Sequence, residues 1–171
     1  MNTTQIYKHN AVYAREHNEL ASYRDSMKVN VACKEAVEAA IRIHFDGMHL
    51  DKAAVSEVMA AFSKERVSYV LANSVQQKDW DGRFSVSNKE WAKHFEIEGT
   101  SKPEYDSRYQ FVVQSHPAVL DGFISMFRRE CALEKEPSKE KPSIMEVMKA
   151  VHLQDKLLTP SKTAKPTEME L

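Results

Sequence analysis

The chain has 171 residues, of which 42% are hydrophobic and 29% charged, a composition typical of one globular domain with appendages. Its formal net charge of -1 argues against both a basic nucleic-acid coat and an acidic DNA mimic. No apolar run is long enough to span a bilayer and no signal-peptide pattern occurs, so we expect a cytoplasmic protein that does not enter the membrane. Only Cys33 and Cys131 occur, and two buried free thiols are the interpretation that we favour.

The first helices follow from apolar spacing. Residues 1–10 carry no pattern and are expected to fray, whereas 11–17 suit a short helical turn and Asn18 is a candidate cap for the next helix. An apolar stripe begins at Leu20, and neither Gly nor Pro interrupts the chain before Gly47. This favours one long helix that changes partners midway over a helix that breaks at residues 26–30.

Residues 29–45 are predicted to be the central buried helix. Glu35, Glu38 and Arg42 share one narrow face, and apolar residues cover nearly all of the remaining circumference. A helix of this kind is typically surrounded by other helices. Glu38 and Arg42, four residues apart, can pair on the wet face, and Gly47 is predicted to end the helix as a residue with positive φ.

Three further helix starts share a capping pattern. Asp51, Ser63 and Ser87 are each predicted as an N-cap, and Ser87 with Glu90 would complete a capping box. Between the last two of these helices lies a loop at residues 78–85, which contains the turn signal Asp81-Gly82. Trp80 and Phe84 flank this turn and are expected to anchor the loop onto the core.

The second half continues the all-α pattern. A loop at 99–106 precedes a predicted helix from Ser107 to about His116, and Pro117 suits the start of another helix. We therefore predict an all-α fold, a compact multi-helix domain around the central helix, with a tethered C-terminal helix. The predicted segments are a helical domain at 1–136, a polar linker at 137–142, an amphipathic helix at 143–158 and a disordered tail at 159–171.

No catalytic, metal or cofactor motif is complete in the sequence. His44, Asp46 and His49 lie around a helix end and not on one helix face, so a zinc site is not predicted. An EF-hand register over residues 77–88 lacks its first and last acidic ligands. Cys33 lies eleven residues from His44 on the same helix, too far for a catalytic pair. The sequence thus predicts no catalytic residue, no metal site and no cofactor.

Basic residues are a modest argument for nucleic-acid binding. Arg128 and Arg129 lie on the outer side of their predicted helix, and lysines recur in the C-terminal segment. Interleaved glutamates cancel most of this charge, so a solvated face is the simpler interpretation. The helix at 143–158 has two open interpretations, a partner-binding arm or a helix docked on its own domain.

Six short sequences carry a family resemblance: ACKEA (32–36), HFDG (44–47), ERVSYVLAN (65–73), DWDGRFS (79–85), NKEWAK (88–93) and SHP (115–117). Over roughly Tyr7 to Leu133 the chain resembles an uncharacterised helical domain found in proteins of conjugative and other mobile elements of gut bacteria. That family has no activity to carry over. Several small mobile-element proteins of this sort look like anti-CRISPR proteins.

The resemblance implies a non-enzymatic, cytoplasmic protein of a bacterial host that inhibits a type II effector nuclease. Its partner would be the Cas9–guide RNA complex, bound on a protein surface, because a net charge of -1 makes a poor phosphate mimic. The alternative is a nucleic-acid-associated accessory or regulatory module for mobile-element transfer, and a third class is a small hydrolase. Aromatic residues and arginine dominate interface energetics. The candidate contact residues are Trp80, Arg83, Phe84, Arg128, Arg129, Ile144, Met148 and Val151.

Overall fold

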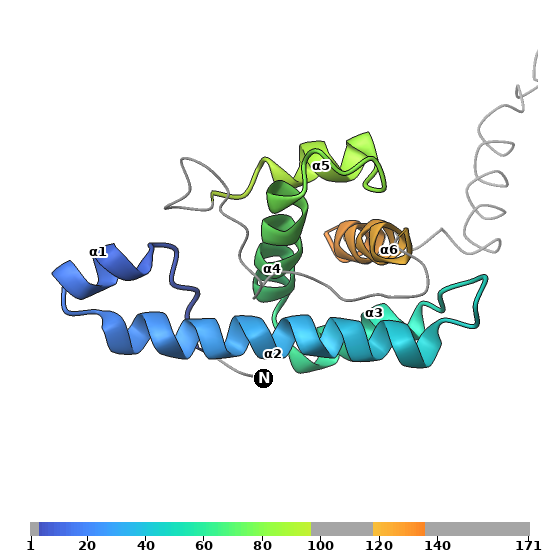
Figure 1. The fold of residues 1–171 in the computed structure, drawn as a ribbon. Coiled ribbons are helices and arrows are strands. Elements are labelled where there is room, and N and C mark those ends of the chain that lie inside the picture. The colour runs from blue at the N-terminus through green and yellow to red at the C-terminus, as the bar shows by residue number, and fades with distance from the viewer. Residues whose placement is uncertain (1–3, 97–117, 136–171) are drawn as a thin grey trace, which may run out of the picture. The chain divides into compact units, whose positions relative to one another are not determined.

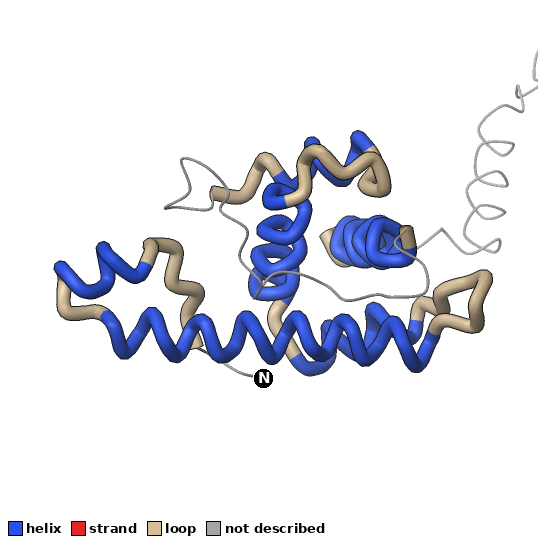
Figure 2. Tube along the Cα trace, in the orientation of Figure 1, coloured by secondary structure: helices blue, strands red, loops and turns tan. Residues whose placement is uncertain are grey.

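The computed structural model describes residues 4–96 and 118–135, and within these ranges every regular element is a helix (Figures 1 and 2). The prediction of an all-α fold is confirmed. An isolated antiparallel bridge joins Phe45 to Leu50. The helices are α1 (Ala11–Glu16), α2 (Leu20–His44), α3 (Ala53–Ala61), α4 (Lys64–Gln77), α5 (Val86–Ala92) and α6 (Val119–Leu133).

The chain divides into two compact units, Met1–Lys135 and Glu136–Leu171. All described residues belong to the first unit. Several predictions lie outside the described residues, namely the helix from Ser107, the linker at 137–142, the helix at 143–158 and the tail at 159–171. None of the helices in the described ranges has the length and apolarity needed to cross a bilayer.

The N-terminal segment from Thr4 lies on α2, so the expectation that it frays is wrong for residues 4–10. The Tyr7 backbone N–H donates to Ser26 Oγ at 2.9 Å, and the Tyr7 hydroxyl donates to Glu19 at 2.7 Å. Asn18 does not cap α2 as predicted: it has a positive φ of 58° in the turn after α1, and Glu19 precedes α2 without a side-chain cap. These tertiary hydrogen bonds have no periodic signature in the sequence.

Helix α2 is continuous over 25 residues, which confirms the prediction of one long helix. The prediction that its circumference is enclosed is wrong, since Ile43 is 68% exposed and Ala32 and Ala39 are also exposed. Figure 1 shows α1, α4, α5 and α6 on one side of α2. Alanine is compatible with solvent and with the core. Counting Ala32 and Ala39 as buried apolar residues therefore overestimated the buried arc of α2. The hydrophobic residues that α2 buries are Val29, Cys33, Val37, Ala40 and Ile41.

Glu38 lies at the margin of the buried face of α2 and not on its wet face. It is only 8% exposed, and its carboxylate lies 3.8 Å from Arg42 and 3.7 Å from Lys34. The predicted pair with Arg42 is therefore present, and Lys34 is a second cation beside the same carboxylate. Two cations beside this carboxylate offset the cost of placing its charge at the edge of the core.

Helix α2 ends at His44 and not through Gly47. Phe45 is extended, and Gly47 takes a positive φ of 102° inside the following turn. The Asp46 carboxylate closes that turn by accepting the backbone N–H groups of Met48 at 2.8 Å and His49 at 2.7 Å. Bonding to these amides lowers the pKa of Asp46. Gly47 thus has the predicted positive φ, but it lies inside the turn and is not the residue that ends the helix.

The predicted caps were partly right. Ser63 caps α4, accepting the Arg66 N–H at 3.3 Å, as predicted. The Asp51 carboxylate accepts the Ala53 N–H at 2.9 Å although Lys52 is the residue at the cap position of α3. Ser87 does not cap α5, because the cap lies two residues earlier, at Ser85.

The core lies between α2, α3, α4 and α6. Helix α6 presents its apolar face as predicted, with Leu120, Phe123, Ile124 and Phe127 buried and Cys131 partly buried. These side chains meet the valines of α3 and α4 in one continuous cluster. The largest fully buried apolar side chains are Phe123, Phe127, Ile41, Leu71 and Ile124.

Arg66 of α4 is 2% exposed and joins three segments of the chain. Its guanidinium donates to the Ser26 hydroxyl at 3.0 Å and the Ser26 carbonyl at 3.3 Å. It also donates to the Asn30 side chain and to the Thr4 carbonyl of the N-terminal segment. Such a charge is tolerated in the interior because its donors are met by acceptors.

Arg66→Ala is expected to destabilise the protein by about 3 kcal/mol, because it strands the buried acceptors of Ser26 and Asn30. Urea unfolding followed by circular dichroism measures this change. Arg15→Ala on the exposed face of α1 is the matched control and should stay within about 0.5 kcal/mol of the wild type. Equal stability of the two variants would contradict the assigned role of Arg66.

Candidate functional site

The turn between α4 and α5, residues 78–85, combines an exposed aromatic side chain with a fixed backbone. Backbone hydrogen bonds run from the Asp81 N–H to the Lys78 carbonyl at 2.8 Å and from the Phe84 N–H to the Asp81 carbonyl at 3.4 Å. The Lys89 ammonium of α5 donates to the Asp79 carbonyl. The turn is therefore closed on itself and tied to the helix after it. We call residues 78–85 the Trp80 turn.

Asp81 and Arg83 form a clasp inside the Trp80 turn. The Asp81 side chain, which belongs to a residue only 5% exposed, accepts the Arg83 backbone N–H at 3.0 Å and the Arg83 Nε–H at 2.9 Å. The terminal guanidinium nitrogen of Arg83 also bonds to Asp81. Hydrogen bonding from Arg83 lowers the pKa of Asp81 to about 2. Where an EF-hand loop would offer this carboxylate to calcium, the arginine already engages it.

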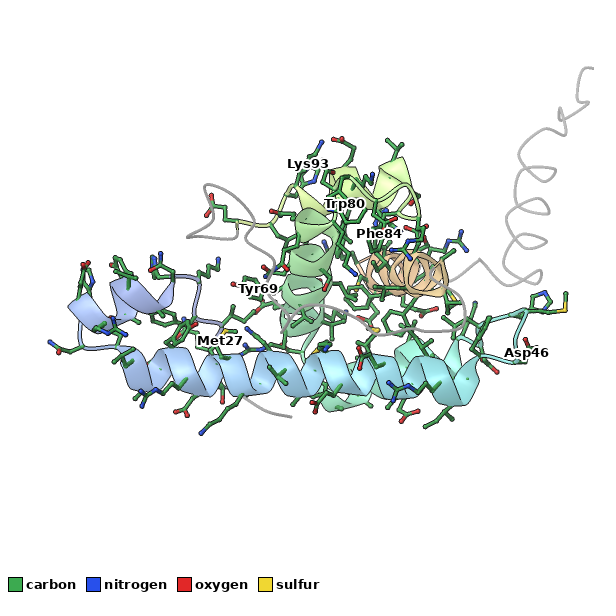
Figure 3. All side chains as sticks on the ribbon, in the orientation of Figure 1. Met27, Asp46, Tyr69, Trp80, Phe84 and Lys93 are labelled. Carbon is green, nitrogen blue, oxygen red and sulfur yellow. The ribbon has the colours of Figure 1, made fainter. Side chains whose placement is uncertain are left out.

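Trp80 and Phe84, both labelled in Figure 3, differ in exposure, although both were expected to anchor the turn. Phe84 is 7% exposed and belongs to the core cluster, so that part of the expectation is confirmed. Trp80 is 78% exposed, so for this residue the expectation is wrong. One aromatic residue suffices to fix the turn, which leaves the indole of Trp80 in solvent.

A buried polar cluster beneath the turn fixes α5 against α6. Asn88 is fully buried and donates to the Asp121 carboxylate at 2.7 Å and to Ser125 Oγ at 3.1 Å. Asp121 also accepts the backbone N–H of Ser85 at 2.9 Å. Since Ser85 ends the Trp80 turn and caps α5, this cluster positions both. Sequence reasoning missed Asn88 and Asp121, because their partners lie more than thirty residues away along the chain.

The two arginines that were predicted to be exposed on α6 differ. Arg128 donates to the Asn88 side chain at 2.7 Å and to Ser87 Oγ at 2.9 Å, and its guanidinium lies 5.7 Å from the Trp91 ring. It is therefore engaged within the domain and not on the outer side of the helix as expected. Arg129 is exposed. Of the other candidate contact residues, Ile144, Met148 and Val151 lie outside the described residues.

The thiols and histidines of the described ranges give no evidence of catalytic or metal chemistry. Burial raises the pKa of Cys33 to about 12, and burial also raises the pKa of Cys131, so both thiols are protonated at neutral pH. His44 bonds to Glu57 at 2.9 Å, whereas Asp46 bonds to backbone amides. Within residues 4–96 and 118–135, no group of three His, Cys, Asp or Glu side chains is arranged to hold a metal ion.

A hollow of about 1320 Å³ lies between the N-terminal segment, the start of α4 and the end of α6. Its lining mixes the charges of Lys64, Glu65 and Lys135 with the apolar surface of Tyr69. Lys64 is already ion-paired with Glu134. The lining shows no pairing of a nucleophile with a base among the described residues, so the Trp80 turn is the stronger candidate site.

A family model described as "Protein of unknown function (DUF3849)" matches residues 6–132. The chain belongs to this family. The match covers all of α1 to α5 and all but the last residue of α6, together with the Trp80 turn. Comparisons with curated proteins and with solved structures found no match. The resemblance to an uncharacterised helical domain is thus confirmed at the level of the DUF3849 family, whereas the links to mobile elements and to CRISPR inhibition stay predictions.

The clasp predicts a pH dependence for the stability of this DUF3849 domain. The pKa of Asp81 is depressed in the folded state, so its stabilisation is complete above the unfolded value of about 3.9 and is lost as the pH falls towards 2. Asp81→Asn should lower the unfolding free energy by about 1 kcal/mol at pH 7 and flatten its fall between pH 5 and pH 2.

The measurement is urea unfolding at a series of pH values. Asp79→Asn is the matched control, because Asp79 is exposed and its backbone carbonyl, not its carboxylate, accepts from Lys89. A pH profile of Asp81→Asn that runs parallel to the wild type would contradict the clasp.

Proposed function

We propose that this domain is a non-enzymatic protein-binding inhibitor that docks through the Trp80 turn, and that its target is a CRISPR effector nuclease of the Cas9 type. The observation that carries the binding function is the exposed indole of Trp80, 78% accessible on a turn that is fixed from beneath. Tryptophan is enriched among the few residues that dominate the energy of protein interfaces. The choice of target rests on the resemblance to small proteins of mobile elements.

Pre-organisation of the turn favours binding. An interface residue on a flexible loop loses conformational entropy when a partner fixes it. Here the Asp81–Arg83 clasp, the buried ring of Phe84 and the tether from Lys89 to Asp79 hold the backbone before any partner arrives. Trp80 itself has only two side-chain torsions to restrict, so most of its buried apolar area contributes to affinity.

The charge of the turn supports a protein partner over bare nucleic acid. Arg83 is paired with Asp81, and Arg128 is engaged with Asn88, Ser87 and the Trp91 ring. Phosphate contacts need cations that release counterions on binding. Of the candidate arginines in the described residues, Arg129 is exposed, and Arg83 is half-exposed although it is paired. An arginine held by its own carboxylate favours a rim contact on a protein over a phosphate-binding face.

Trp80→Ala is expected to weaken binding to guide-loaded Cas9 by about 30-fold, the scale of a hot-spot residue. It should leave the unfolding free energy within about 0.5 kcal/mol of the wild type, because the indole is solvated in the free domain. Titration of the domain into fluorescently labelled Cas9–guide RNA, with a cleavage assay in parallel, measures both binding and inhibition.

Val12→Ala is the matched control, an exposed apolar residue on α1 that is 57% accessible and lies outside the turn. If Trp80→Ala binds Cas9 as tightly as the wild type does, the Trp80 turn is not part of the interface. Absence of wild-type binding to Cas9, with a salt-sensitive shift of bare DNA, would replace the inhibitor by the nucleic-acid accessory module.

A further inference from the structure

The outward face of α2 is a continuous exposed surface on the longest helix of the described residues. Its members recur at intervals of three or four residues, the spacing that aligns side chains along one side of a helix. They comprise Lys28, Ala32, Glu35, Ala39 and Ile43, and all five are exposed. We call this set the outer α2 face. Ile43, in the last turn of α2, is 68% exposed, so no element within residues 4–96 and 118–135 covers this apolar side chain.

The charges of the outer α2 face complement each other under two-fold symmetry. Lys28 and Glu35 are seven residues apart and therefore lie on the same flank of the helix, two turns from each other. In an antiparallel pair of identical helices, a residue on one flank meets the same flank of the other helix. An axis midway between residues 28 and 35 places each lysine opposite the glutamate of the other copy. Two ion pairs then form at once.

The same axis falls beside Ala32, whose small side chain permits the two backbones to approach closely. Ile43 comes to lie level with Leu20 of the partner subunit, near the end of the paired length. This register aligns nearly the whole length of α2, about 37 Å at 1.5 Å per residue.

We propose that the outer α2 face pairs with the same face of a second copy of this chain, antiparallel, with Lys28 opposite Glu35 of the partner subunit. The occupant is a second copy because a two-fold axis converts the charge pattern into attraction without a foreign sequence. A single helix–helix contact belongs to the small interfaces, below about 1,200 Å², which are typical of weak and concentration-dependent association. This pairing goes beyond the proposed function and does not depend on it.

Sedimentation velocity of the full chain from about 5 to 500 µM tests the pairing, since weak interfaces of this size associate in the micromolar range. The expected result is a monomer that converts to a dimer across this range and dissociates further at high salt. Ala32→Glu puts two carboxylates at the axis and should raise the dissociation constant at least 10-fold. Because Ala32 is exposed, circular dichroism should show an unchanged fold.

Charge reversal makes the test specific. Lys28→Glu and Glu35→Lys should each weaken the dimer, because each single change places like charges opposite one another, while the double variant restores both pairs in reversed order. Arg15→Glu, on exposed α1, is the control for net charge and should dimerise like the wild type. Trp80→Ala should also dimerise normally, which separates this surface from the Trp80 turn. A monomer at all concentrations, or a double variant as weak as the single ones, would overturn the proposal.

Discussion

The buried guanidinium of Arg66 is the constraint on which the arrangement of the N-terminal half depends. A charged group in the interior must find acceptors there, and those of Arg66 come from α2 and from the N-terminal segment. This requirement sets the position of α4 against Ser26 and Asn30, one turn apart on α2. It also holds Thr4 of the N-terminal segment, although that segment has little apolar pattern of its own. The apolar core then packs between α2 and α4, whose relative position these hydrogen bonds specify.

The polar cluster around Asn88 and Asp121 fixes the position of α5, as Arg66 fixes the position of α4. Helix α5 has only seven residues, too few for a stable isolated helix, so its position depends on tertiary contacts. Asn88 supplies them by bonding to Asp121 and Ser125 and accepting from Arg128. Because Ser85 joins the same cluster, the end of the Trp80 turn is fixed by α6. Trp80 can therefore remain in solvent without loosening the backbone that presents it.

Sequence patterns predicted the parts of the fold that depend on local chemistry. The apolar stripe of α6, the continuity of α2 and the cap at Ser63 all depend on residues within a few positions of each other. Predictions failed where a distant partner decides the outcome: Ser85 caps α5 in place of Ser87, which instead bonds to Arg128. At the candidate site, the turn and the anchoring role of Phe84 could be predicted. The exposure of Trp80 could not be predicted, because it depends on which of the two aromatic rings, that of Trp80 or that of Phe84, packs into the core.

Failure to predict the exposed side of α2 has a different physical cause. Ala32 and Ala39 bury little area and fit solvent or core equally well, so a projection that counts alanine as apolar extends the buried arc too far. The polar residues are the better guide: Lys28 and Glu35 mark the exposed side, whereas Glu38 lies at the margin of the core with cations beside it. The inner and outer sides of helix α2 thus have different roles. Its inner side carries the acceptors of Arg66 and the apolar core, so changes to its outer side can alter association while the fold is kept.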